Sequence, residues 1–455
     1  MKIVIQGAGA VGSHLAKMLR AEGNEITVID DNPSRLQNLE NNVDILSIEG
    51  NPTSINVLKQ AEVDSADLFI AVYPSALQDM NVVGAILAKK LGAQKVLARV
   101  NSEEYLNAEN KLMFKELGIE LMFYPEKIAA DEIVDQIKHS TFSESMDFAH
   151  GRLQIAVFKL DENSPLLDLR LIDFARQFDQ EDASKFRIIA VSRGDKTVIP
   201  RPDTTFQFGD LVFTIAKREG MDRLVKYFGK KNISVHKVMI IGGSPISVMV
   251  AKSLCKAGIE VTVIDSDRAR CEEIAEALPD EIRVVTGDGR NSQFLYEEGI
   301  FEYDAFVALT GEDEYNILSC VVAKKLGVPR TVAEVENFEY TRLAEEMGVD
   351  SVINKKIITA GRIFKFTLSG RARFVKYMSG TDAEIIEYTV APGSPITRKP
   401  LKELGFPQGA IIGGVIRGSE AIIAVGDTLI EPYDRVAIFA LPDTLKQIDR
   451  FFTKA

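Results

Sequence analysis

The sequence contains no tryptophan, and it has only three cysteines and four histidines in 455 residues. The cysteines, Cys255, Cys271 and Cys320, lie far apart in the second half and form no C-x-x-C pair. This pattern excludes a disulfide framework and a cysteine-based metal site, and it is typical of a reducing compartment. The histidines show no metal-ligand spacing. We therefore expect a cytoplasmic protein without a metal centre.

The sequence also has fewer basic than acidic residues. The chain has 54 Lys and Arg against 66 Asp and Glu, a net charge of −12 and a pI near 5.1. This balance argues against a nucleic-acid partner and against direct docking on anionic lipid. No run of about 18 apolar residues is present, so we expect no segment inserted in a membrane. The chain opens with a strand pattern, and we expect no signal peptide.

Catalytic signatures are missing as well. The sequence has neither a G-x-S-x-G elbow nor a Walker A motif. A hydride-transferring enzyme needs a general acid–base such as histidine beside the nicotinamide, and no histidine follows a late strand. The sequence therefore favours a sensor over an enzyme, with an NAD-dependent oxidoreductase as the alternative class. The acidic charge disfavours a third class, a nucleotide-sensing repressor.

The first thirty residues carry the clearest motif. The strand Lys2–Gln6 leads into GAGAVG, in which Gly7, Gly9 and Gly12 have G-x-G-x-x-G spacing, and the strand Ile26–Asp30 ends on an acid. In such units the first glycine permits the turn, the second lets a pyrophosphate approach, and the third lets the helix pack closely. The helix N-terminus attracts phosphate. This pattern predicts a nucleotide site.

Asp30 narrows the choice of nucleotide. Its carboxylate is placed to accept hydrogen bonds from ribose hydroxyls. A 2′-phosphate about 4 Å away would meet a repulsion of ~4 kcal/mol at an effective dielectric constant of ~20, and the next residue, Asp31, is also acidic. NAD(H) is therefore favoured over NADP, while ATP and ADP, which have free ribose hydroxyls, remain open.

Strands and helices alternate through the first domain. The strand patterns and a helix pattern with apolar residues at i, i+3 and i+4 predict a parallel sheet with right-handed crossovers. Ligands bind such sheets at the carboxyl ends of the strands. The expected strands are Asp44–Gly50, Asp67–Val72, Lys95–Val100 and Ile119–Met122, and the helix is Met80–Gly92.

The second half repeats this design. Lys237–Ser247 aligns with the opening strand and turn, Asp265 follows Asp30 by 235 residues, and VVAKKLG matches ILAKKLG at the same offset. The first copy has two extra residues, and they fall in the loop Tyr73–Gln78. Since the insertion is confined to a loop, the whole sheet is predicted to be duplicated.

Each sheet domain is followed by a helix and a smaller β-rich unit. The layout is A–B–A′–B′, with domains expected at 1–130, 131–232, 233–356 and 357–455 and crossover helices near Asp131–His139 and Ile357–Leu368. The expected strands of the small units are Arg152–Leu160, Phe186–Arg193, Asp210–Ala216, Ala383–Val390, Ala410–Gly418, Glu420–Val425 and Asp434–Leu441.

Further candidate contacts follow the later strands of the first sheet and its repeat. Asn51 and Asp288 follow the third strands and are expected near an adenine, and Tyr73 and Pro74 follow the fourth. Arg99 ends the fifth strand. A buried arginine needs an anionic partner, and we expect a nucleotide phosphate there, with a structural carboxylate as the alternative.

The second copy of the site is degenerate. Gly242 and Gly243 remain, but Ser247 stands where the first copy has Gly12, Pro245 lies inside the turn, and Glu334 replaces Arg99. Asp265 is retained, so a ribose could still be held. We expect weaker binding or a different ligand there.

This order of domains, with GAGAVG, Asp30, Arg99 and the asparagines Asn81 and Asn316 ahead of the AKKLG helices, resembles the TrkA family. These proteins are RCK (KTN)-domain regulatory subunits of Trk potassium-uptake systems. The resemblance covers essentially the full length. It implies two tandem Rossmann-like N-lobes, each followed by a small α+β C-lobe.

The resemblance also implies a role and a site. A homo-oligomeric ring of RCK domains would bind NAD(H), ATP or ADP and regulate a TrkH-type potassium-transporting membrane protein from the cytoplasmic face of the inner membrane. The C-lobes would supply contacts between subunits or a further small-ligand site. By resemblance, the nucleotide contacts are Gly7, Ala8, Gly9, Ala10, Val11, Gly12, Asp30, Tyr73, Pro74 and Arg99 in the first lobe, and Gly242, Gly243, Ser244, Pro245, Ile246, Asp265, Thr310 and Glu334 in the second.

Overall fold

The computed structural model describes residues 1–74, 77–138, 144–148, 151–177, 184–194, 196–230, 234–364, 366, 372–377, 381 and 383–452. The chain forms two compact units. One contains residues 1–129 and 355–367, and the other contains residues 130–354 and 368–455. Ser75 and Ala76, in the predicted insertion loop, lie outside the described residues.

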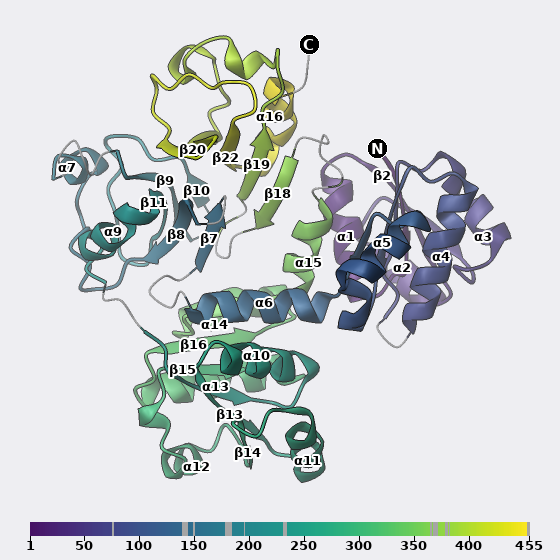
Figure 1. Cartoon of the computed structure of the whole chain (residues 1–455), viewed down its shortest axis with the longest axis horizontal. Helices are drawn as coiled ribbons and strands as arrows, with labels where there is room; N and C mark the ends of the chain where they lie inside the picture. The colour runs from purple at the N-terminus through teal and green to yellow at the C-terminus, as the bar shows by residue number, and fades with distance from the viewer. Residues whose placement is uncertain are drawn as a thin grey trace. The chain divides into compact units, whose positions relative to one another are not determined.

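The first unit, whose N-terminal part is drawn in purple and blue in Figure 1, is built on a six-stranded parallel sheet. The strand order is β3-β2-β1-β4-β5-β6. This confirms the predicted parallel sheet, and the ends of the predicted strands shift by no more than about two residues. The strands are β1 (Lys2–Gln6), β2 (Glu25–Asp30), β3 (Leu46–Glu49), β4 (Leu68–Ala71), β5 (Lys95–Arg99) and β6 (Leu121–Phe123).

Amphipathic helices cover this sheet. In α1 the buried residues Val11, Leu15, Ala16 and Leu19 form one apolar stripe. The helix α15 (Lys355–Phe364), which comes from far along the chain, packs against α1. The helices described in the sheet domain of this unit include α1 (Ala10–Ala21), α2 (Pro33–Glu40), α3 (Ile55–Gln60), α4 (Gln78–Leu91) and α5 (Ala108–Glu116), with short 3-10 turns η1 (Val63–Ser65) and η3 (Glu103–Leu106).

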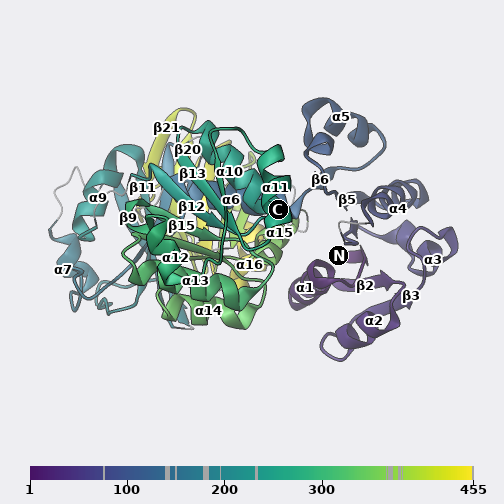
Figure 2. The same cartoon turned by 90° about the horizontal axis from the view of Figure 1, so that it is seen from below.

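The second unit contains the duplicated sheet, in the order β14-β13-β12-β15-β16-β17. Figure 2 shows α10 and α11 on one side of this sheet and α13 and α14 on the other. The strands are β12 (Lys237–Ile241), β13 (Glu260–Asp265), β14 (Arg283–Thr286), β15 (Ala305–Ala308), β16 (Arg330–Glu334) and β17 (Ser351–Ile353). The helices are α10 (Pro245–Lys256), α11 (Arg268–Ala277), α12 (Ser292–Glu297), α13 (Asp313–Lys325) and α14 (Phe338–Glu346), with the 3-10 turn η5 (Ile300–Glu302).

The two C-lobes are antiparallel sheets with the same strand order, β10-β9-β11-β8-β7 and β21-β20-β22-β19-β18. The sequence did not predict the edge strands β7, β10 and β18. The strands are β7 (Glu144–Phe148), β8 (Leu153–Lys159), β9 (Phe186–Arg193), β10 (Lys196–Val198), β11 (Leu211–Lys217), β18 (Ala372–Tyr377), β19 (Glu384–Thr389), β20 (Ala410–Arg417), β21 (Glu420–Ile423) and β22 (Arg435–Ala440).

Helices join and flank the C-lobes. The first crossover helix is longer than predicted, since α6 begins at Pro125. The predicted ends of the crossover helices, His139 and Leu368, lie outside the described residues. The helices are α6 (Pro125–Lys138), α7 (Leu171–Ala175), α9 (Met221–Tyr227) and α16 (Leu445–Phe452), with 3-10 turns η4 (Arg218–Gly220), η6 (Pro395–Thr397), η7 (Leu401–Glu403) and η8 (Pro442–Thr444).

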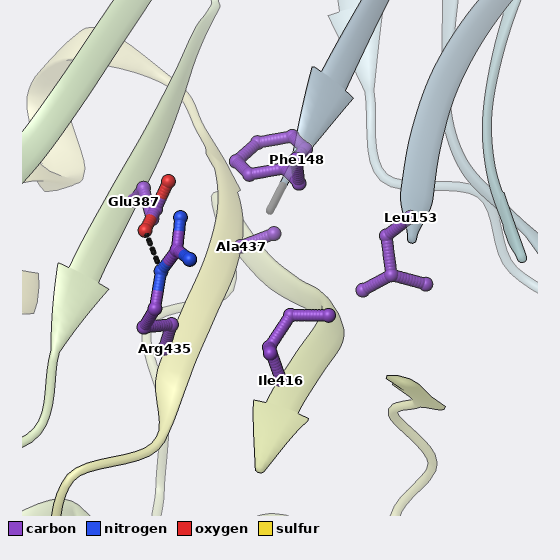
Figure 3. Close-up of a pocket in the computed structure, with 6 residues that line it drawn as sticks. All are labelled: Phe148, Leu153, Glu387, Ile416, Arg435 and Ala437. Atoms are coloured by element: carbon purple, nitrogen blue, oxygen red, sulfur yellow. Dashed lines mark hydrogen bonds and ion pairs between the residues drawn. The ribbon is translucent and has the colours of Figure 1, made fainter. Parts of the chain in front are cut away.

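The two C-lobe sheets share one apolar core. Phe213 of the first and Phe439 of the second lie with ring centroids 5.3 Å apart. Gly414 permits this approach, because a Cβ there would lie 2.7 Å from a methyl carbon of Leu153. Figure 3 shows the small hollow between the sheets. The hollow has no room for a water molecule, so it indicates packing and not a ligand site.

Each C-lobe carries the same ion pair between a partly exposed arginine and a buried aspartate. Arg193 donates two hydrogen bonds, both of 2.7 Å, to Asp210, and Arg417 donates two, of 3.0 and 2.8 Å, to Asp434. The two aspartates are 0% and 1% exposed. The duplication therefore reaches to the level of individual hydrogen bonds.

Candidate nucleotide-binding sites

The three glycines after β1 occupy three different settings. Gly7 has a φ of +110°, which favours glycine, and a Cβ there would lie 3.0 Å from the backbone nitrogen of Tyr73. A Cβ on Gly12 would lie 1.8 Å from the carbonyl oxygen of Gly7, so α1 packs this closely only with glycine. A Cβ on Gly9 would meet nothing within 4 Å. The space above Gly9, at the N-terminus of α1, suits a phosphate approaching the backbone.

The neighbouring residues of the turn complete this phosphate cradle. Ala8 is buried, Ala10 is exposed and starts α1, and Val11 is buried against the sheet. Gly9 is the N-cap of α1, no side chain caps it, and no acidic residue lies in the first turn. The free N–H groups of this helix end therefore carry the attraction for an anion.

Asp30 at the end of β2 is fully buried. One carboxylate oxygen accepts a hydrogen bond of 2.6 Å from the Ala8 N–H, and the other accepts one of 2.9 Å from the Asn32 N–H. Arg35 lies 3.8 Å away on the outer side. The carboxylate thus fastens the glycine turn to the end of β2, at the place where the sequence predicted a ribose contact.

Tyr73, after β4, crosses the glycine turn. A ring carbon of Tyr73 lies 3.0 Å from where a Gly7 Cβ would stand. The Tyr73 hydroxyl accepts a hydrogen bond of 2.9 Å from the Asp31 N–H and donates one of 3.2 Å to the Asp31 carboxylate. The residue is 1% exposed. Burial, with smaller contributions from the charges of Asp30 and Asp31, raises the pKa of Tyr73 well above its usual range, so the hydroxyl keeps its proton.

Asn81 in α4 joins the ends of two strands. Its amide oxygen accepts from the Tyr73 N–H at 2.8 Å, and its amide nitrogen donates to the carbonyl oxygens of Tyr73 and Arg99 at 3.1 and 3.2 Å. The residue is fully buried. It therefore fixes the backbone on which Tyr73 and Arg99 stand.

Arg99 is buried at 9% exposure and pairs with Glu126 at 2.8 Å. Glu126 is the carboxylate alternative to the phosphate partner that the sequence left open. The pairing is incomplete, because Arg99 Nε and Glu126 Oε2 are buried without a hydrogen-bond partner. The guanidinium thus retains an unused donor for a further acceptor.

The other predicted residues of the first site lie around its edge. Asn51 is exposed, and its side-chain oxygen accepts from the N–H and hydroxyl of Thr53 at 2.9 and 2.8 Å. Pro74 is half-buried beside Tyr73. Asn51 therefore shapes the loop after β3.

The second glycine turn has the same backbone arrangement as the first, but the helix N-terminus expected to face a phosphate is different. Gly242 has a φ of +99°, and the N–H of Gly243 donates a hydrogen bond of 2.6 Å to Asp265. Ser244 takes the place of Gly9, and its hydroxyl oxygen caps α10 by accepting from the Ser247 N–H at 3.3 Å. Pro245 then removes one N–H of the first turn. This helix end offers fewer free donors than that of α1, and Ile246 behind it is buried.

Asp288, after β14, belongs to a local cluster. It accepts from the Tyr315 hydroxyl at 2.7 Å and pairs with Arg290, which lies over the Tyr315 ring at 4.3 Å from its centroid. The hydrogen bond from Arg290, ahead of that from Tyr315, lowers the pKa of Asp288 to about 2. Asp288 is therefore an ionised acceptor at the place where the sequence predicted an adenine contact.

The backbone groups of Thr310 and Glu334 are held by an asparagine, as those of Tyr73 and Arg99 are in the first half. Asn316 accepts from the Thr310 N–H at 2.9 Å and donates to the Glu334 carbonyl oxygen at 2.8 Å. Glu334 is buried. A buried carboxylate here makes this site less suited to a phosphate than the first.

The structure thus brings the predicted residues together at the carboxyl ends of β1, β2, β4 and β5, and at their counterparts in the repeat. Sequence reasoning did not assign site roles to Glu126, Asn81, Asn316 and Tyr315. The asparagines recur at matching positions in the two halves, and this repetition could have identified them from the sequence. Glu126 and Tyr315 had no such sequence signal. Among the described residues, no group of His, Cys, Asp or Glu is arranged to hold a metal ion.

Comparison with known proteins matches two family models, each of them twice. The TrkA-N domain matches residues 3–125 and 238–355, and the TrkA-C domain matches residues 155–229 and 385–453. The two models alternate along the chain in the order that the sequence predicted.

Curated relatives match over nearly the whole chain. The Trk system potassium uptake protein TrkA homolog 1 of Methanosarcina mazei is 31% identical over 99% of this chain and 100% of its own. A TrkA homolog of Archaeoglobus fulgidus is 33% identical over 99% and 100%, and the TrkA of Azorhizobium caulinodans is 30% identical over 99% and 98%.

Solved structures share the fold. The GsuK RCK domain has a TM-score of 0.60 at 18% identity and covers 99% of this chain and 94% of that one. The GsuK channel bound to NAD has a TM-score of 0.61 at 17% identity and covers 98% and 78%.

Two glycine turns on duplicated parallel sheets, each sheet followed by an antiparallel lobe, define a protein with tandem RCK-type halves. With both domain models matched and relatives about 30% identical over full length, the chain belongs to the TrkA family. The resemblance and the fold class predicted from the sequence are confirmed. The relatives are named as potassium-uptake proteins, which agrees with the prediction that the chain is not an enzyme.

Across the described residues, no helix combines the length and the apolar character needed to cross a bilayer.

Proposed function

We propose that this chain is a cytoplasmic, nucleotide-sensing regulatory subunit of a potassium-uptake system. It would act on a TrkH-type transporting protein at the cytoplasmic face of the inner membrane. The observation that carries this proposal is the full-length similarity to proteins named Trk system potassium uptake protein TrkA. The two nucleotide-type turns, in a sequence with no histidine after a late strand of either sheet, support a sensing role over a catalytic one.

The proposed ligand of the first lobe is NAD(H), with ATP and ADP as alternatives. The N–H groups around Gly9 would hold phosphate oxygens, and Asp30 would accept from ribose hydroxyls. Arg99, at the end of β5, would meet a terminal phosphate. Similar solved structures are named as GsuK bound to NAD and GsuK bound to ADP, which supports both options.

The proposed assembly is a homo-oligomeric ring built from the four domains 1–130, 131–232, 233–356 and 357–455. A ligand shifts the balance between two arrangements of such a ring only by binding one of them more tightly. ATP and NADH differ in charge near Arg99, and that difference is where they would favour different arrangements.

Calorimetric titration of the full chain with NADH, ATP and ADP tests the ligand. Asp30→Ala and Arg99→Ala should weaken the binding of at least one nucleotide about tenfold or more, which corresponds to a charge-assisted hydrogen bond. Arg20→Ala is the matched control, because Arg20 pairs with Asp44 at the far end of α1. Unchanged affinity in both site variants would refute the assignment.

Potassium uptake tests the role. A strain lacking this chain should grow poorly under potassium limitation, and the wild-type gene should restore growth. Normal uptake in the deletion strain would count against the regulatory function, and steady NADH oxidation with a small carbonyl compound would favour an oxidoreductase.

A further inference from the structure

The two halves of the chain provide an internal comparison at the ribose end of the site. In both, one carboxylate oxygen of the β2-type acid accepts from the glycine turn at 2.6 Å. The other oxygen accepts from the N–H two residues further on, at 2.9 Å for Asp30 and 2.8 Å for Asp265. The two carboxylates are therefore held by matching backbone hydrogen bonds.

Access does differ. Asp30 is 0% exposed, whereas Asp265 is partly exposed. The residue after the fourth strand is Tyr73 in the first half and Thr310 in the second, and an asparagine holds each by the same N–H contact, at 2.8 and 2.9 Å. Only the tyrosine is long enough to cross the turn and reach the residue after the acid.

The Tyr73 ring has a defined resting place. Its hydroxyl bridges the N–H and the carboxylate of Asp31, and its ring lies against Gly7. Asp31 directly follows Asp30, so these bonds hold the hydroxyl of Tyr73 at the end of β2, next to the predicted ribose acceptor. With the ring in this place, the Asp30 carboxylate is 0% exposed.

We propose that Tyr73 closes the first nucleotide site, so that a nucleotide binds there only when the ring leaves the glycine turn. This inference rests on the proposed function. The phosphate end above Gly9 is open while the ribose end is closed, and the second half shows the reverse, with an accessible Asp265 and a Ser244-capped helix. The apparent affinity of the first site is then reduced by the fraction of molecules in the closed state.

A second side chain also differs between the halves. Ala8 carries a methyl group that Gly243 lacks, and a Cβ on Gly243 would lie 3.1 Å from the Asp265 carboxylate. Because Ala8 is itself a predicted nucleotide contact, the control is taken from outside the turn: Arg20→Ala removes an exposed pair with Asp44.

The test is titration of the full chain with ADP and with NAD, together with the association rate. Tyr73→Thr, which copies the second half, should bind about tenfold more tightly and associate faster, because two hydrogen bonds and a buried ring no longer compete. Tyr73→Phe keeps the ring and loses the hydroxyl bonds, so its gain should be smaller, about threefold. Arg20→Ala, the control, should leave the affinity unchanged.

The outcomes separate the two proposals. Weaker or unchanged binding by Tyr73→Thr, with wild-type binding still sensitive to Asp30→Ala, overturns the closure and leaves the proposed function standing. Binding by neither wild type nor Tyr73→Thr overturns both. Binding by Tyr73→Thr alone is the strongest support for closure.

A spectroscopic measurement gives a second readout. The chain has no tryptophan, so Tyr73→Trp introduces a single reporter at the turn. Acrylamide should quench it poorly in the free protein and more strongly when ADP is bound. Protection that stays the same or increases with ADP would mean that the ring stacks on the ligand, and it would overturn the closure.

Discussion

Arg99, the last residue of β5, donates a hydrogen bond of 2.8 Å to Glu126 in the first turn of α6. In the repeat, Glu334 ends β16 and Lys356 is the second residue of α15, as Glu126 is of α6. The duplicated positions therefore carry the same pair of charges in exchanged order. In the first copy the buried charge on the strand is paired with the opposite charge on the following helix.

Arg99→Ala should destabilise the first N-lobe by about 2–3 kcal/mol, because it leaves Glu126 buried without its partner. Arg99→Glu combined with Glu126→Lys, the arrangement of the repeat, should recover most of this loss. Hydrogen exchange in peptides from residues 1–129 measures both effects. Arg20→Ala, which removes an exposed pair, should cost less than about 1 kcal/mol. If the double variant lost as much stability as the two single changes added together, Arg99 and Glu126 would not stabilise each other.

Gly9→Ala should lower nucleotide affinity without lowering stability, whereas Gly12→Ala should lower stability. The Gly12 variant forces a methyl group against the Gly7 carbonyl oxygen and should lower stability by about 1–3 kcal/mol. The Gly9 variant meets no protein atom, so its stability should be unchanged while nucleotide affinity falls. Thermal unfolding and titration with ADP distinguish the two variants. Equal loss of stability in both would show that the space above Gly9 is structural.

The two equivalent ion pairs of the C-lobes should contribute equally to the free energy of unfolding. Asp210→Asn and Asp434→Asn each weaken a bidentate bond to a partly exposed arginine and should cost about 1–3 kcal/mol. Asp427→Asn, at an exposed pair with Lys402, is the control and should cost less than about 0.5 kcal/mol. Urea unfolding measures the three. A loss in only one C-lobe would contradict the equivalence of the two pairs.

Asp288 should contribute a small pH-dependent stability. Its pKa is lowered to about 2 in the folded chain, below about 3.9 in the unfolded chain. The contribution is therefore complete above about pH 4 and is lost as the pH falls toward 2. Arg290→Gln should remove part of it, at most about 1 kcal/mol because the pair is largely exposed. The difference from wild type in urea unfolding should shrink between pH 5 and pH 3. A constant difference would exclude this origin.

The fold was predictable from local patterns. Apolar strands alternating with amphipathic helices indicate a parallel sheet wherever they occur, and the GAGAVG spacing places the turn and the helix start without tertiary information. The offset of 235 residues between Asp30 and Asp265 then duplicates the sheet. The edge strands β7, β10 and β18 escaped this reasoning, because short edge strands have little periodicity of their own.

The state of the site was not predictable in the same way. Asp30, Tyr73 and Arg99 were chosen by sequence, yet their partners Ala8, Asp31 and Glu126 come from other elements. Hydrogen bonds between residues far apart in the chain form only between groups that the packing of the sheet and helices brings into contact. The sequence pattern alone does not show which groups these are.

The sequence by itself determined that this chain contains two copies of a glycine turn followed by an acid, because spacing and strand pattern are properties of the chain. Only the tertiary structure decided that the first acid is covered and the second is accessible. The reason is steric: Tyr73 is long enough to cross the turn to Asp31, and Thr310 is not.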